Sequence, residues 1–88
     1  MNATSINDPI AQFNVNVYPN PANEVINVKS DYMIKNISLV NYVGQTVFSD
    51  VVNDNTFQIN VSNYITGMYF VRVETVEGSV ITKRITIE

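Results

Sequence analysis

Apolar and polar side chains alternate along most of this chain. The alternation is clearest in residues 13–18, 56–61 and 69–74, where every second side chain is apolar. A period of two residues is typical of β-strands that bury one face and expose the other to water. Clusters of Gly, Pro, Asn and Asp separate the alternating stretches, and these residues favour turns. The pattern therefore predicts short strands joined by turns.

Seven strands are predicted from the alternation and from the turn residues between them. They are Phe13–Tyr18, Glu24–Ser30, Ile34–Tyr42, Gln45–Val52, Thr56–Val61, Gly67–Glu74 and Ser79–Ile87. Short strands at this spacing are typical of sandwiches and small barrels. We predict an all-β fold, a seven-stranded immunoglobulin-like antiparallel sandwich with Greek-key topology, in which Tyr64 closes the open end of the core.

The predicted sandwich domain occupies residues 13–88. Residues 1–12 lack the alternation and carry a turn signal at Asn7-Asp8-Pro9, so we expect them to form a flexible linker.

Six residues at turns and strand entries are expected to define the fold. Proline fixes φ and lacks the N–H that a strand ladder needs, so the two prolines end the first strand. Glycine is free to adopt the positive φ that tight turns require. The six residues are Pro19, Asn20, Pro21, Gly44, Gly67 and Tyr69.

The composition favours the same fold. The chain has 14 Val and 10 Ile but one Leu and three Ala, and β-branched side chains pack well on a pleated sheet. It has no Cys and no His, so neither a disulfide nor an ordinary structural zinc site is expected. The domain must therefore be held by apolar packing and backbone pairing.

The charge pattern excludes some partners. The net charge is −3 and 15% of the residues are charged. Nucleic-acid binding needs clustered Lys and Arg, and so does electrostatic binding to a membrane surface. We therefore expect no nucleic-acid partner, and no apolar run reaches the roughly 18–20 residues of a transmembrane helix.

The chain is also poor in residues for catalysis. Nucleophilic catalysis needs a nucleophile beside a base, and His and Cys are absent. Glu74 and Glu77 are predicted to flank an exposed hairpin rather than a cleft. Asp50 and Asp54 suit calcium by their oxygen ligands, but their spacing does not match an EF-hand loop and a plain turn is the simpler interpretation. We expect no enzyme, no cofactor and no metal site.

Three stretches, in one order, then point to a family. They are Val17-Tyr18-Pro19-Asn20-Pro21-Ala22 followed by Val25-Ile26-Asn27-Val28, then Leu39 to Val47, then Ile59-Asn60-Val61 through Gly67 to Val73 with Gly78 and Lys83-Arg84-Ile85. Together they resemble the C-terminal sorting domain of the type IX (Por) secretion system of Bacteroidetes, type A. One departure lies near Asn41, where that family often has an acidic residue.

The resemblance implies a non-catalytic sorting signal that directs a cargo protein, joined to it in the same chain, through the type IX system. Cargo of that family enters the periplasm by a separate signal and reaches the outer-membrane surface or the medium. The implied partners are the outer-membrane translocon and a sortase-like cysteine peptidase, which commonly removes the domain. Cleavage would then fall in or before the cargo-proximal linker, residues 1–12. We expect a monomer or a weak dimer.

The closing strand is the predicted recognition site. The strand runs to Glu88, and we expect its edge to be free to pair with a strand of a partner. The resemblance places its last residues in the family's terminal motif. The candidate residues are Lys83, Arg84, Ile85, Thr86, Ile87 and Glu88. The alternative for the two basic residues is that they protect the edge against aggregation.

Two other functions remain open. Tyr18, Tyr42 and Phe70 are predicted to point outward, as the sugar-stacking rings of a surface carbohydrate-binding or adhesion module do, although we favour a covering role on the sheet. The other function is a structural cap that stabilises a neighbouring catalytic domain.

Overall fold

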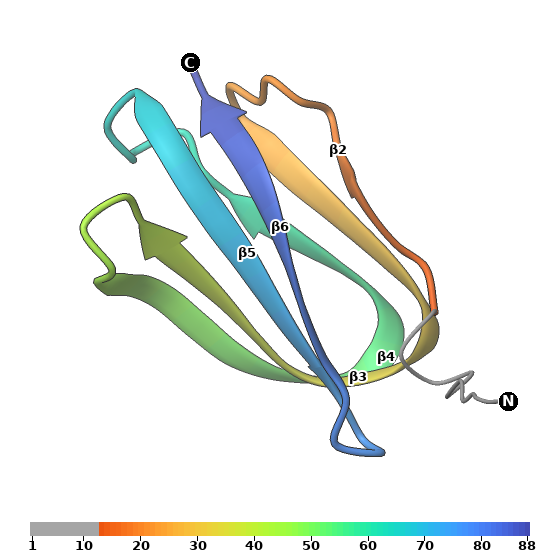
Figure 1. The fold of residues 1–88 in the computed structure, drawn as a ribbon. Coiled ribbons are helices and arrows are strands. Elements are labelled where there is room, and N and C mark those ends of the chain that lie inside the picture. Colours follow the sequence, from red (N-terminus) through yellow and green to blue (C-terminus); the bar gives the residue numbers. More distant parts are fainter. Residues whose placement is uncertain (1–12) are drawn as a thin grey trace, which may run out of the picture.

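The computed structural model describes residues 13–88, and the predicted linker at residues 1–12 lies outside the described residues. The described chain is all-β, with five antiparallel strands that form one curled, half-barrel sheet (Figure 1). The strands are β2 (Val15–Tyr18), β3 (Val25–Asn41), β4 (Thr46–Asn60), β5 (Gly67–Thr75) and β6 (Val80–Ile87).

β3 is the central strand of this sheet. One of its flanks pairs with β4 along most of its length, from Val25↔Asn60 to Val40↔Thr46. The other flank pairs first with β2 and then, from Ile34 onward, with β5. β6 pairs with β5 and completes the order β2-β3-β5-β6. The two ends of β3 therefore have different neighbours, and the sheet curls between them.

Two of the predicted turns are bends within continuous strands. The sequence predicts strand ends at Asp31 and at residues 53–55, whereas β3 and β4 run through both positions. The pairing register shifts between Lys29 and Ile34, and Asn53 has a φ of 54°. Five strands are therefore found in place of seven, because turn-forming residues here bend the ladder without ending it.

Hydrogen bonds at the bend in β3 replace those that the ladder loses there. The Tyr32 N–H donates to the Ser30 Oγ at 3.2 Å. The Asn55 side-chain N–H groups donate to the carbonyl oxygens of Ser30 and Asp31, at 3.2 and 3.3 Å. The Val76 N–H donates to the carbonyl of Met33 at 3.0 Å. These bonds give partners to the Tyr32 N–H and to the carbonyl groups of Ser30, Asp31 and Met33.

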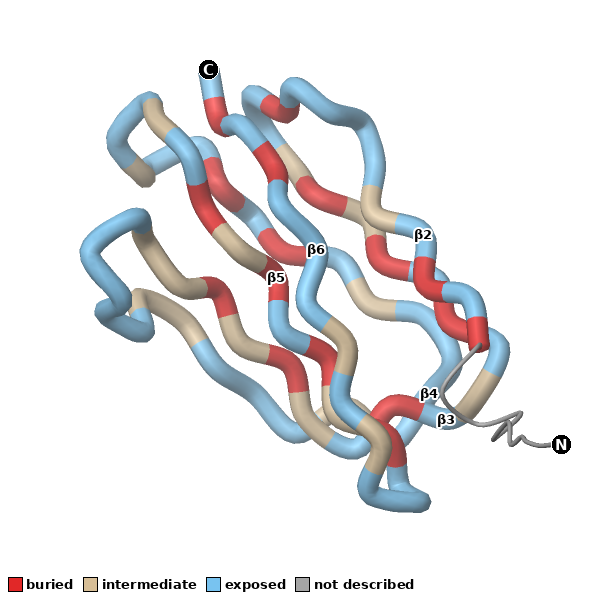
Figure 2. Tube along the Cα trace, in the orientation of Figure 1, coloured by how far each residue is buried: buried red, intermediate tan, exposed pale blue. Residues whose placement is uncertain are grey.

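The inner face of the curled sheet forms the core. Buried and exposed residues alternate along the strands, as the sequence pattern predicts (Figure 2). The buried apolar residues are Phe13, Val15, Ala22, Ile26, Val28, Ile34, Ile37, Leu39, Ile59, Val61, Tyr69, Val71, Val73, Ile85 and Ile87. Tyr64 packs against this core, with its ring centroid 6.3 Å from that of Tyr69.

The turn between β3 and β4 shows why Gly44 is needed. Its φ is 90°, a value that side chains disfavour. The Asn41 Oδ1 accepts hydrogen bonds from the N–H groups of Val43 and Gln45, at 3.1 and 2.9 Å. The asparagine side chain therefore holds the turn in the shape that the glycine permits.

We expect Ile37→Ala to be strongly destabilising, because the Ile37 side chain is fully buried in β3. The loss should be about 2–5 kcal/mol of unfolding free energy, the range for truncating a buried isoleucine. Val51→Ala is the control, since Val51 is 62% exposed, and it should change stability by less than about 0.5 kcal/mol. Urea unfolding of both variants measures this, and equal losses would contradict the core assignment.

Candidate recognition site on the closing strand

β6 is an edge strand whose two faces differ. It pairs with β5 from Gly67↔Ile87 to Glu74↔Val80 without a register shift. The side chains of Ile85 and Ile87 point into the core and are 0% and 1% exposed. The other four candidate residues of the predicted site, Lys83, Arg84, Thr86 and Glu88, are exposed. A partner that touches the folded domain can therefore meet four of the six side chains.

The outer edge of β6 is covered at its C-terminal end by the segment Asn20–Ala22, which we call the latch. The Ala22 N–H donates to the Thr86 carbonyl at 2.8 Å, and the Glu88 N–H donates to the Ala22 carbonyl at 2.7 Å. These bonds form a parallel bridge between Ala22 and Ile87. The turn that ends β2 therefore also pairs with the last residues of β6.

The Asn20 side chain adds two further bonds to the latch. Its Oδ1 accepts from the Thr86 N–H at 3.1 Å, and its Nδ2 donates to the Arg84 carbonyl at 3.5 Å. Sequence reasoning assigned Asn20 to the fold and named Ala22 only as part of the first family stretch, without a role in the structure. An Asn between two prolines is a turn signal in the sequence, and no local signal shows which distant strand it contacts.

The rest of the outer edge is open. Backbone N–H and C=O groups of one strand residue point to the same flank, and the flank alternates from residue to residue. The N–H and C=O groups of Thr86 point to the latch. Val80 and Thr82 lie an even number of residues before Thr86, so their N–H and C=O groups point to the same outer edge. In the described part of the chain no strand pairs with residues 80–83 on this side. The prediction of a free closing edge is thus corrected: the edge is open at residues 80–83 and covered at residues 84–88.

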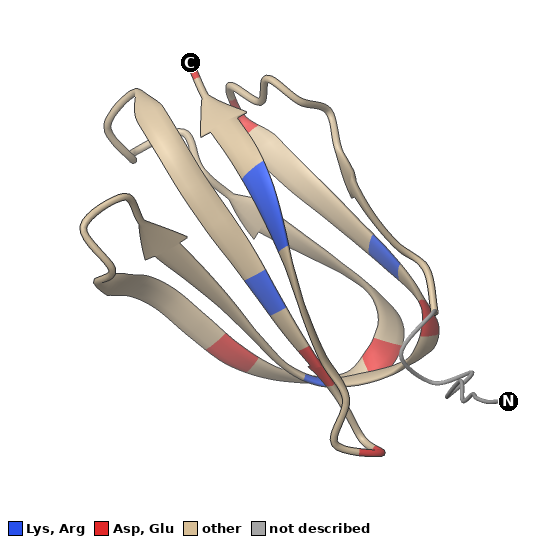
Figure 3. Ribbon diagram, in the orientation of Figure 1, with Lys and Arg blue, Asp and Glu red and all other residues tan. Residues whose placement is uncertain are grey.

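Positive charge gathers near this edge. Of the five Lys and Arg residues in the chain, Lys83 and Arg84 lie on β6 and Arg72 lies on the adjacent β5 (Figure 3). Arg72 pairs in register with Thr82 on the open half of the edge. Acidic residues gather near the bend and the last hairpin, where Asp31, Asp54 and Glu77 lie. Glu74 lies opposite Val80 on β5 and Glu88 follows β6, so the three basic residues exceed the acidic ones at this edge by one, on a domain with a net charge of −3.

Asp50 and Asp54, which were weighed as calcium ligands and interpreted as turn residues, accept hydrogen bonds from backbone N–H groups. The Asp54 Oδ1 accepts hydrogen bonds from the N–H groups of Asn55 and Thr56, and the Asp50 Oδ1 accepts one from Val51. Within residues 13–88, no three His, Cys, Asp or Glu side chains are grouped so that they could hold a metal ion. The same residues include no helix with the length and apolar character to cross a bilayer.

We expect Asn20→Ala to loosen the end of β6, because it removes both side-chain bonds of the latch. The loss should be about 1 kcal/mol of unfolding free energy, as for other solvent-accessible hydrogen bonds. Native-state hydrogen exchange should show a faster Thr86 amide and an unchanged Val71 amide. Asn16→Ala is the control on the exposed face of β2, and a Thr86 amide that exchanges equally in both variants would contradict the latch.

Comparison with known proteins assigns the chain to a family. A family model described as a secretion system C-terminal sorting domain matches residues 16–88. No curated protein sequence matches the chain. Among solved structures, PorZ, a surface component of the type IX secretion system of Porphyromonas gingivalis, superimposes with a TM-score of 0.71 at 16% sequence identity over 84% of this chain. CopC from Methylosinus trichosporium OB3b superimposes with a TM-score of 0.52 at 11% identity, over 85% of this chain and 94% of CopC.

These likenesses differ in what they show. The two solved structures share the fold alone at such low identity, and this chain spans 11% of the PorZ chain. The family match runs from β2 through β6. Because it covers far more than half of the sequence, the chain belongs to the family of type IX (Por) secretion system C-terminal sorting domains, which are non-catalytic secretion signals for a cargo protein.

Proposed function

We propose that the secretion machinery recognises this domain through β6. The observation that carries the proposal is the split outer edge, where an open backbone at residues 80–83 lies next to exposed basic side chains. An open strand edge can accept a strand of a partner, and its side chains then add specificity. The partner in this proposal is the outer-membrane translocon.

The proposal also concerns the route of the cargo. The family shows that the domain serves cargo bound for secretion or the cell surface. We propose passage through the periplasm to the outer-membrane surface, with release by a sortase-like peptidase that cuts in or before residues 1–12. The support for that cleavage site is the polar sequence with a turn signal that precedes residues 13–88.

The proposal includes a finer description of the fold. We propose that the bends in β3 and β4 divide the sheet into the two layers of a seven-stranded immunoglobulin-like sandwich. The first layer would hold β2, the first half of β3 and the second half of β4. The second would hold the remaining halves of β3 and β4 with β5 and β6. The pairings on either side of residues 30–33 support this division.

We expect the double variant Lys83→Glu/Arg84→Glu to reduce export of a fused reporter cargo. Loss of one charge-assisted bond of about 1.4 kcal/mol weakens binding roughly tenfold. The readout is the fraction of reporter on the cell surface and in the medium of a host with a type IX system. Lys29→Glu/Lys35→Glu is the matched control, since it changes the net charge equally and both residues are exposed on β3. Equal export of the two variants would contradict recognition at β6.

A second substitution separates backbone recognition from side-chain recognition. Thr82→Pro removes an N–H that points to the open edge and leaves the pairing with β5 intact, as proline on an edge strand can. We expect it to reduce export, whereas Thr82→Val, which keeps the N–H, should not. A thermal melt of both variants confirms folding. Normal export of a folded Thr82→Pro variant would rule out strand addition at this edge.

A further inference from the structure

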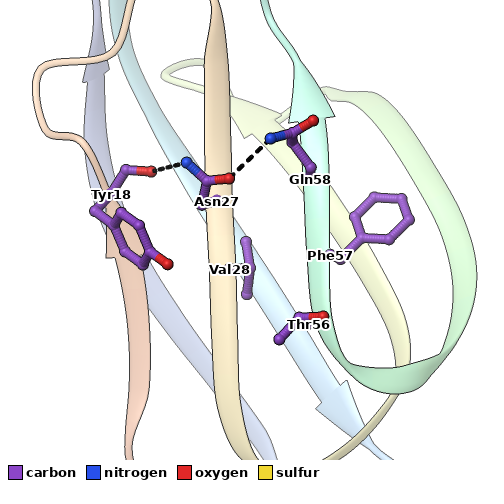
Figure 4. Close-up of a pocket in the computed structure, with 6 residues that line it drawn as sticks. All are labelled: Tyr18, Asn27, Val28, Thr56, Phe57 and Gln58. Atoms are coloured by element: carbon purple, nitrogen blue, oxygen red, sulfur yellow. Dashed lines mark hydrogen bonds between the residues drawn. The ribbon is translucent and has the colours of Figure 1, made fainter.

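A hollow of about 330 Å³ lies on the outer face of the sheet, away from β6. Its residues come from the end of β2, from β3 and from the second half of β4, namely Tyr18, Asn27, Val28, Thr56, Phe57 and Gln58 (Figure 4). Val28 is buried on the inner face, so its backbone, rather than its side chain, contributes to the floor. The volume is at the lower end of the ~300–1,000 Å³ range of small-molecule sites.

Tyr18 supplies an aromatic wall for this hollow. Its ring lies along one side of the space in Figure 4, and the residue is 49% exposed. An exposed tyrosine offers a rigid apolar face and a polar hydroxyl tip at a low cost in conformational entropy. A flat ligand with C–H groups on one face and hydroxyl groups around its rim matches such a wall.

Two amides on the adjacent strands are already held in place. The Asn27 Nδ2 donates to the Tyr18 carbonyl at 3.3 Å, and the Gln58 Nε2 donates to the Asn27 Oδ1 at 2.9 Å. Each amide has two donor hydrogens and one acceptor oxygen. Among the described residues, these bonds leave the Gln58 oxygen and one N–H of each amide for a ligand. Donors and acceptors held beside one another suit neighbouring hydroxyl groups, which both donate and accept.

The lining also indicates an uncharged ligand. None of the six lining residues is ionised at neutral pH. A second hollow, on the outer face of β3, β4 and β5, has charged residues in its lining. Asp50, Arg72 and Glu74 line it, and it has no aromatic residue. Aromatic and neutral polar groups meet in the first hollow and not in the second.

We propose that the hollow beside Tyr18 is a carbohydrate-binding site. One neutral sugar ring stacks on the Tyr18 ring, and its hydroxyl groups bond to the free amide groups of Asn27 and Gln58. Thr56 lines the hollow further along β4. The site goes beyond the sorting function and does not depend on recognition through β6. Because the hollow is shallow, a single sugar ring should bind in the millimolar range.

The test is an NMR titration of the ¹⁵N-labelled 88-residue chain. The probes are D-glucose, D-galactose, D-mannose and N-acetyl-D-glucosamine, each added separately. We expect at least one sugar to shift the side-chain amide signals of Asn27 and Gln58 in a saturable manner. Gln58→Leu and Tyr18→Leu should each weaken that binding about tenfold, which corresponds to roughly 1.4 kcal/mol.

Tyr42→Leu is the matched control, because Tyr42 is a 73% exposed tyrosine in the turn between β3 and β4, outside the hollow. It should leave the affinity unchanged within about twofold. Thermal melts show whether each variant is folded. The proposal is overturned if none of the four sugars shifts these signals, if the shifts map to another face, or if Tyr42→Leu weakens binding as much as Tyr18→Leu. None of these results bears on export, so the site and the sorting proposal fail separately.

Discussion

The pairing of β3 with three other strands is the interaction on which the rest of the structure depends. β3 contacts β2, β4 and β5, and β6 joins the sheet through β5. With no disulfide to restrain it, so short a chain must bury its apolar rows efficiently. The bend at residues 30–33 allows this, because it turns the inner faces of both ends of β3 toward one core. The hydrogen bonds that the Asn55 side chain donates and that the Ser30 Oγ accepts make that bend compatible with a continuous strand.

The sequence predicts the inner face of the sheet well and its continuity poorly. Alternation is a local property, so the buried positions Ile59, Val61 and Val71 follow directly from it. Asp31 and Asn53 were interpreted as strand ends because Asp and Asn favour turns. The same residues tolerate the backbone of a bulge, and whether the partner strand continues past them depends on distant residues. The number of strands is thus harder to predict than the side of each strand that is buried.

The candidate site shows the same limit. Alternation along the last strand places Lys83 in the same inward-facing row as Ile85 and Ile87. The two isoleucines are buried, but Lys83 is exposed, and alternation alone does not predict that difference. The latch joins Asn20 to residues 64 and 66 positions away. No periodicity or turn signal carries information over that separation. The sequence therefore predicted that the last strand lies at a sheet edge but not which part of that edge is open.

In the proposed recognition through β6, the latch would link binding of the partner to folding of the domain. The inward side chains of β6 belong to the core, and the backbone of its last residues is held by a segment that follows β2. The exposed side chains of the closing strand therefore have a fixed spacing only when the first and the last strands are both in place. A partner that reads Lys83 and Arg84 together with the open backbone of Thr82 would bind the folded domain much better than an unfolded chain, because the unfolded chain must first lose the conformational entropy of ordering that strand. A sorting signal recognised in this way would report that its own domain is folded, which a short linear motif of the same residues could not do.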